Sequence, residues 1–171
     1  MRLLCDEMLK GVGRWLRAAG YDVGIVGDRA RDEDLLARAA AEDRLLLTCD
    51  RRLARRAAPA APVAVLGTGS RPRVARRLGI DWLHAPFTRC LLDNAPLLPA
   101  RQGDIAKMPA QTRDGDGPVM RCPECNRVYW PGSHVRRMLA KLTRWQSCSV
   151  RPEHRRPQQQ VKARRGHRPA P

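Results

Sequence analysis

Three aspartates in the first half of the chain stand where a strand is expected to end or a helix to begin. Asp6 follows the apolar run 3–5, Asp50 comes just after the run 45–48, and Asp32 opens a helical pattern. Ligands bind open parallel sheets beyond the carboxyl ends of the strands, so we expect these side chains to share one edge. Carboxylates held close together repel one another unless a cation lies between them, and Mg²⁺ prefers oxygen ligands. The pattern predicts a magnesium site at Asp6, Asp32 and Asp50, suited to activating water for displacement at phosphorus.

Each of these aspartates also has a purely structural interpretation. Asp32 suits the N-cap of the helix that it opens. Asp6 and Asp50 suit the turns that follow strands. Only their convergence on one edge favours a metal site, and that convergence requires the elements around them to form a parallel sheet.

The second half of the chain contains a metal-ligand pattern with one letter changed. Cys122 and Cys125 form a C-x-x-C pair, and Cys90 and Asp93 form a C-x-x-D pair upstream. Two C-x-x-C pairs at this separation are typical of a zinc ribbon, in which four ligands surround Zn²⁺ as a tetrahedron. A carboxylate oxygen also binds zinc, so Asp93 is the expected fourth ligand. His134 or a water molecule is an alternative fourth ligand, and loss of the metal is another interpretation.

The first 80 residues alternate between strand and helix patterns. Apolar side chains recur at helical spacing, and buried strands appear as short apolar runs. The patterns predict strands at 3–5, 21–26, 44–48 and 63–66, and helices at 8–19, 32–40, 51–57 and 71–78. Strands that alternate with helices form a parallel sheet with helices on both faces. The predicted fold class is therefore α/β.

The chain is strongly basic. Its 171 residues include 33 Lys or Arg and 17 Asp or Glu, a formal charge of +16, which favours polyanionic partners such as RNA. Residues 146–171 are rich in Pro, Gln and Arg with few large apolar side chains, and we expect a disordered basic tail. No apolar run is long enough to span a membrane, and Asp6 and Glu7 interrupt any signal peptide. We expect a cytoplasmic protein without a membrane partner.

The order of these motifs resembles the Mut-seven C-terminal RNase domain family. The resemblance covers about residues 1–140 and rests on the stretches Asp6-Glu7-Met8-Leu9, Gly13-Arg14-Trp15-Leu16-Arg17, Asp32-Glu33-Asp34, Thr48-Cys49-Asp50-Arg51, Cys122-Pro123-Glu124-Cys125 and Val128-Tyr129-Trp130-Pro131-Gly132-Ser133-His134. It implies a PIN-like domain in residues 1–89 and a zinc ribbon in residues 90–145. It also implies RNA cleavage with Mg²⁺ or Mn²⁺ held by acidic residues, whose positions fall on Asp6, Asp32 and Asp50. The chain departs from the family pattern at Asp93, where the ribbon has a cysteine.

The sequence therefore predicts a metal-dependent ribonuclease with a zinc ribbon. Basic side chains from the helices and the ribbon would hold the RNA backbone, and we expect Arg14, Arg17, Arg51 and Arg127 among them. The alternative is a zinc-ribbon protein without catalytic activity, which binds RNA or recruits a protein partner.

Overall fold

The computed structural model describes residues 1–27, 30–57, 61–67, 71–106, 108–113, 115 and 117–149, without the side chains of residues 72 and 73. Most of the predicted tail, from residue 150 onward, lies outside the described residues. Residues 146–149, which we also assigned to the tail, form the last turn of a helix.

The first part of the chain alternates strands and helices, as its periodicity predicts. Its elements are β1 (Arg2–Cys5), the 3₁₀ turn η1 (Glu7–Leu9), α1 (Lys10–Ala18), β2 (Asp22–Ile25), α2 (Asp32–Ala41), β3 (Leu45–Thr48), α3 (Arg51–Ala57), β4 (Val63–Val65) and α4 (Arg71–Leu78). Gly20 ends the α1 segment with a φ of 95°, a conformation that glycine adopts at little cost. A Cβ at Gly20 would also lie only 2.3 Å from the carbonyl oxygen of Ala85.

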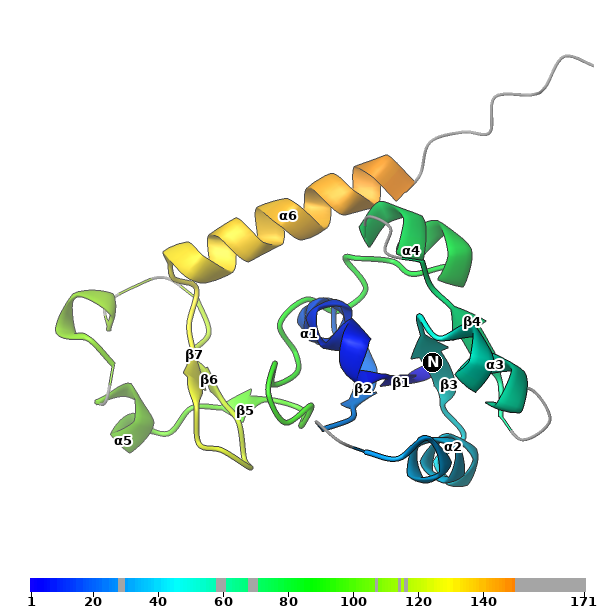
Figure 1. Ribbon diagram of the computed structural model, residues 1–171. Coiled ribbons are helices and arrows are strands. Elements are labelled where there is room, and N and C mark those ends of the chain that lie inside the picture. Colours follow the sequence, from blue (N-terminus) through cyan, green and yellow to red (C-terminus); the bar gives the residue numbers. More distant parts are fainter. Residues whose placement is uncertain are drawn as a thin grey trace, which may run out of the picture.

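The four strands of this part form a parallel sheet in the order β2-β1-β3-β4 (Figure 1). The chain first adds β2 on one side of β1 and then places β3 and β4 on the other side. The strand order therefore reverses between β1 and β3. In open parallel sheets, a crevice for ligands forms at such a switch point, beyond the carboxyl ends of the two strands.

Alternate residues of the strands face two separate apolar cores. Leu3 and Leu47 pack on one face with α1, α4 and the C-terminal helix α6 (Ser133–Ser149), and Trp82 is fully buried there. Leu4 and Leu46 pack on the opposite face with α2 and α3. The period of two along a strand thus produces a sheet that is covered on both sides.

The second part of the chain builds a small antiparallel sheet. Its elements are β5 (Leu98–Pro99), α5 (Gln102–Ile105), the 3₁₀ turn η2 (Ala110–Thr112), β6 (Met120–Arg121) and β7 (Val128–Tyr129), with strand order β5-β6-β7. Helix α6 then runs from the end of β7 toward α4 (Figure 1). Its Leu142 is fully buried in the core that contains Trp82. No helix in the described ranges combines the length and the apolar character needed to cross a bilayer.

Candidate functional site: an acidic strand edge and a cysteine cluster

The carboxyl ends of β1 and β3 bring Asp6 and Asp50 together through the side chain of Thr48. Thr48 Oγ1 donates a hydrogen bond to Asp6 Oδ2 at 2.8 Å and accepts one from the backbone N–H of Asp50 at 2.9 Å. The backbone N–H of Asp6 donates to the carbonyl of Leu47 at 3.0 Å, which extends the β1–β3 pairing to the aspartate itself. Both aspartates therefore lie at the switch point of the sheet.

Asp50 also caps helix α3, which begins at the next residue. Its Oδ1 accepts hydrogen bonds from the backbone N–H groups of Arg52 at 2.6 Å and Leu53 at 3.3 Å, which is the geometry of a helix cap. Asp6 Oδ1 and Asp50 Oδ2 accept no hydrogen bond from the residues that the structure describes. One oxygen of each carboxylate thus remains available to a ligand.

Asp32 does not join this arrangement. It is the first residue of α2 rather than its N-cap, and its Oδ2 pairs with Arg56 Nη1 of α3 at 2.9 Å. Within the described part of the chain, the three aspartates do not form a group whose oxygens lie within 4.8 Å of one another. The structure places two of the predicted acids at the switch point and holds the third against a neighbouring arginine. Both partners of that pair are half-exposed, so it is worth at most about 1 kcal/mol.

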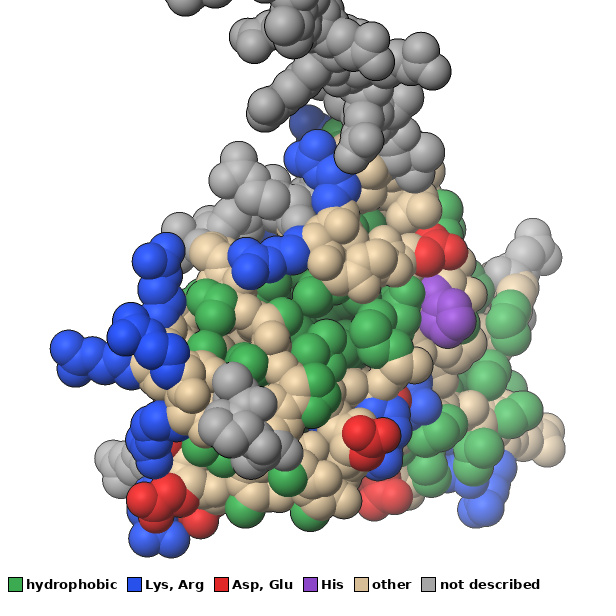
Figure 2. All heavy atoms as spheres, turned by 90° about the vertical axis from the view of Figure 1, so that its right-hand side faces the viewer, with side chains coloured by type: hydrophobic (Ala, Val, Ile, Leu, Met, Phe, Trp, Pro, Cys, Tyr) green, Lys and Arg blue, Asp and Glu red, His purple; other side chains and the backbone are tan. Residues whose placement is uncertain are grey.

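Exposed arginines follow directly after Asp50. Arg51, Arg52, Arg55 and Arg56 all belong to α3 and all reach solvent. Figure 2 shows the side of the molecule on which α3, α4 and β4 lie, where Lys and Arg side chains gather along one margin of a hydrophobic area. Arg51, which we expected to contact RNA, is therefore available for that role beside the acidic edge.

The predicted ligands of the second metal site lie in two turns of the same geometry, residues 90–95 and 122–127. In each turn the first N–H donates to the carbonyl five residues later, at 2.8 and 2.9 Å. The fifth N–H donates back to the first carbonyl, at 3.0 and 3.1 Å. The fifth residue is Asn94 or Asn126, each with a positive φ (70° and 58°) that asparagine tolerates.

Asp93 occupies in the first turn the place that Cys125 occupies in the second. The ligand atoms of Cys90, Asp93, Cys122 and Cys125 all lie within 4.8 Å of one another. Asp93 Oδ2 accepts from the Sγ atoms of Cys90 and Cys122, both at 3.3 Å, and the Sγ atoms of Cys90 and Cys125 lie 3.8 Å apart. Bonds of about 2.3 Å from zinc to sulfur at tetrahedral angles place two sulfurs roughly 3.8 Å apart. These four residues can hold a metal ion, and His134 is not among them.

Tyr129 approaches this cysteine cluster from β7. Its hydroxyl lies 3.1 Å from Cys90 Sγ and accepts a hydrogen bond from the backbone N–H of Leu91 at 3.2 Å. Burial raises the pKa of the Tyr129 hydroxyl, and its contact with Cys90 raises it further. The hydroxyl therefore keeps its proton and can donate it toward the sulfur, as groups around metal ligands commonly do.

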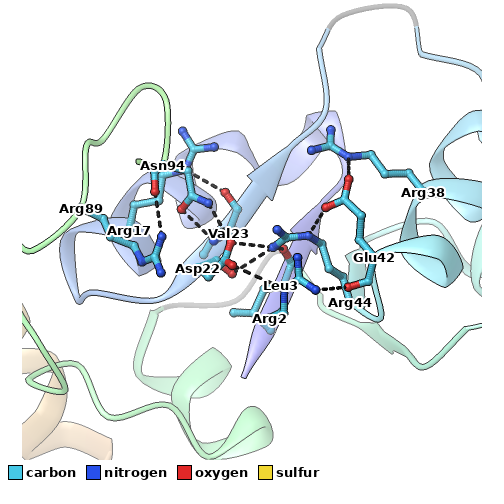
Figure 3. A network of polar contacts seen from close by, with 10 residues as sticks. All are labelled: Arg2, Leu3, Arg17, Asp22, Val23, Arg38, Glu42, Arg44, Arg89 and Asn94. Atoms are coloured by element: carbon cyan, nitrogen blue, oxygen red, sulfur yellow. Dashed lines mark hydrogen bonds and ion pairs between the residues drawn. The ribbon is translucent and has the colours of Figure 1, made fainter. Parts of the chain in front are cut away.

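Arg17 is not available to RNA, so our prediction for this residue was wrong. Its side chain is buried. Its Nε donates to the carbonyl of Val23 at 2.8 Å, and its Nη1 donates to the carbonyls of Leu91 (3.1 Å) and Leu92. The spacing that puts Arg17 on one face of α1 does not reveal that the 90–95 turn covers that face. Arg17 instead joins α1 to β2 and to the 90–95 turn. Figure 3 shows its side chain beside Val23.

Asn94 makes a second connection between the same parts. Its Oδ1 accepts from the N–H of Val23 on the edge strand β2 at 2.9 Å, and its Nδ2 donates to Asp22 Oδ1 at 2.7 Å (Figure 3). Asp22 also accepts from Arg44 Nη1 at 2.7 Å. Burial acts to raise the pKa of Asp22, but the hydrogen bonds from Arg44 and Asn94 outweigh it and lower that pKa to about 2.

The remaining predicted RNA contacts are exposed, and they lie on one groove. Arg14 of α1 and Arg127 of the second turn both line it.

Sequence reasoning missed Thr48 as the link between the aspartates and Tyr129 as the contact to Cys90. The signal for Thr48 is a single hydroxyl at the end of an otherwise apolar strand, just before Asp50.

The fold and the site define an α/β protein with an acidic strand edge and an attached cluster of metal ligands. The family model of the Mut7-C RNAse domain matches residues 1–142. The chain therefore belongs to the Mut7-C RNAse domain family, which confirms the resemblance of its motifs. Among curated proteins and among solved structures, no significant match to the chain is found. The family match includes both the four-stranded sheet and the cysteine cluster.

Proposed function

We propose that the protein is a metal-dependent ribonuclease of PIN-like fold, which hydrolyses RNA phosphodiester bonds at the edge formed by Asp6 and Asp50. The observation that carries this proposal is the placement of both aspartates at the switch point between β1 and β3, joined through Thr48. Membership in an RNase domain family supports the same reaction. The net charge of +16 supports a polyanionic substrate.

Asp6 and Asp50 would hold a Mg²⁺ or Mn²⁺ ion with the oxygens that accept no hydrogen bond from described residues. Mg²⁺ is commonly held by one or two carboxylates together with substrate phosphates, so two aspartates are sufficient. When bound, the ion supplies a positive charge that offsets the phosphate and favours deprotonation of the attacking water. The buried Thr48 hydroxyl fixes Asp6, and the cap at α3 fixes Asp50.

Asp32 and the arginines of α3 would complete the site around the substrate. An RNA phosphate that approaches Arg56 would compete for its guanidinium and would free the carboxylate of Asp32. The exposed pair between Arg56 and Asp32 costs little to break. Arg51 and its neighbours in α3 would neutralise the phosphates on either side of the scissile bond.

Zn²⁺ is the ion that we propose for Cys90, Asp93, Cys122 and Cys125. Three sulfurs and one carboxylate oxygen at tetrahedral separations suit zinc, and a site closed by four protein ligands is structural rather than catalytic. Elemental analysis of freshly purified protein should find about one zinc per chain. A folded, freshly purified sample without zinc would contradict this assignment.

Cleavage of a labelled RNA by zinc-loaded protein tests the catalytic proposal. We expect cleavage in Mg²⁺ or Mn²⁺ and none when both ions are omitted. A chelator is avoided because it would also strip the cysteine cluster. Asp6→Asn and Asp50→Asn should each lower the rate by about 100-fold or more, because they remove ligands of an ion worth several kcal/mol in the transition state. Asparagine caps a helix as well as aspartate does, so Asp50→Asn leaves α3 intact.

Asp43→Asn is the matched control, because Asp43 is exposed and its φ of 48° suits asparagine. This variant should cleave like the parent. If Asp6→Asn and Asp50→Asn also cleave like the parent, a contaminating nuclease explains the activity and the proposal is wrong. If the parent binds RNA but does not cut it in either ion, the protein is a binding module instead.

A further inference from the structure

We propose that a groove between α1, the two metal-holding turns and the start of α6 binds a short single-stranded segment of the RNA substrate. The inference rests on the ribonuclease function proposed above and adds to it the binding surface and the strandedness of the RNA. We call this surface the α1–α6 groove. It consists of two adjoining hollows of about 500 and 580 Å³ that share Arg14, Leu91 and His134 in their walls.

The charge of the α1–α6 groove is of one sign. Its walls contain Arg14, Arg127, Arg137 and Lys141 and no acidic side chain. All four are exposed, and none of them forms an ion pair with a described residue. Four cations without acidic neighbours create a positive potential that phosphates can neutralise. Lys141 also lies over the ring of Trp15, 5.7 Å from its centroid, but a neutral or apolar occupant would leave all four charges without an anion.

The lining of the groove includes an aromatic side chain. Trp130 lines the groove and is half-buried. A Cβ at Gly132 would lie 2.9 Å from Trp130 Nε1, so the missing side chain lets the indole lie against the backbone. The neighbouring Tyr129 is held by its hydroxyl at the cysteine cluster. A fixed aromatic ring beside cations is the arrangement with which proteins bind single strands, whose bases stack on the ring while phosphates meet the cations.

The groove also has a suitable position relative to the acidic edge. Arg14 follows Asp6 by eight residues along η1 and α1, which is on the order of 12 Å of helix. An RNA strand that crosses the edge can therefore reach Arg14 within a few nucleotides. Paired bases cannot stack on Trp130, because a duplex keeps them inside the helix and exposes its backbone and grooves. The groove therefore favours unpaired RNA.

Binding of an unstructured, fluorescent oligouridine tests the proposal without cleavage. Zinc-loaded Asp6→Asn protein is used in buffer without Mg²⁺ or Mn²⁺. In this background Trp130→Ala should weaken binding roughly 5- to 100-fold, the effect of losing one stacked base, and Trp130→Phe should restore most of it. Arg14→Ala and Arg137→Ala should each reduce the slope of log affinity against log salt by about 0.7.

Arg76→Ala is the matched control, because Arg76 is an exposed arginine of α4 outside the groove. It should change affinity and salt slope less than the groove variants do. Duplex RNA should bind more weakly than oligouridine and should not respond to Trp130→Ala. Equal losses in Arg76→Ala and the groove arginines, or an unchanged affinity in Trp130→Ala, would overturn the proposal.

If Trp130→Ala loses zinc, its binding data cannot test the groove. Photocrosslinking of 4-thiouridine RNA to the protein without groove substitutions then provides the test. Crosslinks to residues 14–15, 91–92 or 127–141, which line the groove, support the proposal, and crosslinks confined to other segments overturn it. These measurements are independent of cleavage. An RNA that crosslinks at the groove but is not cut by the parent protein would contradict only the catalytic proposal.

Discussion

The Thr48 hydroxyl holds the carboxylate of Asp6 and the backbone of Asp50 at one point of the sheet edge. Because Thr48 is fully buried, its side chain does not reach solvent or substrate. Its effect on cleavage must therefore pass through the two aspartates. This makes Thr48 a positioning residue.

Thr48→Val replaces the hydroxyl by a methyl group of similar size. We expect a higher Mn²⁺ concentration for half-maximal cleavage, by about 10-fold, because Asp6 loses the hydrogen bond that orients it. Thr48→Ser restores the hydroxyl and should restore the metal requirement. A Thr48→Val protein with a lower maximal rate but an unchanged Mn²⁺ requirement would indicate a purely structural role.

We expect Asp93 to make the proposed zinc site weaker than a site of four sulfurs. Asp93→Cys should bind zinc at least about 10-fold more tightly in competition with a chromophoric chelator, because thiolates are the softer ligands. Asp93→Ala should bind it more weakly than the parent. Glu124→Cys is the control, since it adds a sulfur to the second turn outside the ligand positions. Equal zinc affinity in the parent and Asp93→Ala would contradict a ligand role for Asp93.

Residue types and spacing predicted the cysteine cluster better than the acidic edge. The two ligands in each turn are separated by two residues, so the local backbone geometry is almost sufficient to place them. The Asn that follows each pair indicates the same type of turn. Asp32 and Arg17 depend on which distant segments pack beside them. Asp32 forms an ion pair with Arg56. Arg17 donates hydrogen bonds to the carbonyls of Leu91 and Leu92. Spacing along one helix does not contain that information.

The elements of the α/β part were largely predictable. Helices α3 and α4 have the predicted bounds, and the four strands lie within one or two residues of theirs, because buried strands and amphipathic helices carry strong periodic signals. The strand order was not predicted, since periodicity does not rank neighbours in a sheet. Helix α6 was also missed, although its Leu142 is fully buried against the first core.

The edge strand β2 is covered by the polar network of Asp22, Asn94 and Arg44, and this network predicts a pH effect on stability. Asp22 has a folded pKa of about 2 against an ordinary value of 3.8. Its contribution to the free energy of unfolding is therefore complete above about pH 4 and is lost as the pH falls through 2. The shift corresponds to about 2 kcal/mol.

Urea unfolding of the parent and Asp22→Asn at several pH values measures this contribution. The difference in free energy of unfolding should be largest at pH 5 to 6 and should shrink by about 2 kcal/mol toward pH 2. Asp34→Asn is the control, because Asp34 is exposed and, among the described residues, its ion pair is with Arg31 of its own segment. A difference between the parent and Asp22→Asn that does not change with pH would contradict the proposed network.

The molecule as a whole is held together by α6 and by the 90–95 turn. Helix α6 follows the small sheet and packs its Trp145 against Trp82 and Trp15, with ring centroids 5.3 and 4.6 Å apart. Gln146 Oε1 accepts a hydrogen bond from the backbone N–H of Trp82 at 2.9 Å. The cysteine cluster and the acidic edge therefore belong to one continuous packing arrangement.

Two truncations test the basic residues 150–171 and the last turn of α6 separately. Deletion of residues 150–171 removes seven Lys or Arg and should weaken RNA affinity and flatten its salt dependence without lowering the melting temperature. Deletion of residues 146–171 also removes Gln146 and should lower the melting temperature by several degrees. An RNA salt dependence that is identical in the full chain and the shorter deletion would contradict an RNA-binding tail.

The proposed catalytic site depends on a divalent cation held by Asp6 and Asp50 at the switch point of the sheet. Electron paramagnetic resonance of Mn²⁺ titrated into the zinc-loaded protein tests it directly, because free and bound Mn²⁺ are distinguished without any RNA. We expect a bound Mn²⁺ whose affinity falls at least about 10-fold in Asp6→Asn and in Asp50→Asn and stays unchanged in Asp43→Asn. Mn²⁺ binding that is absent from the parent protein, or that is equal in all four proteins, would contradict it.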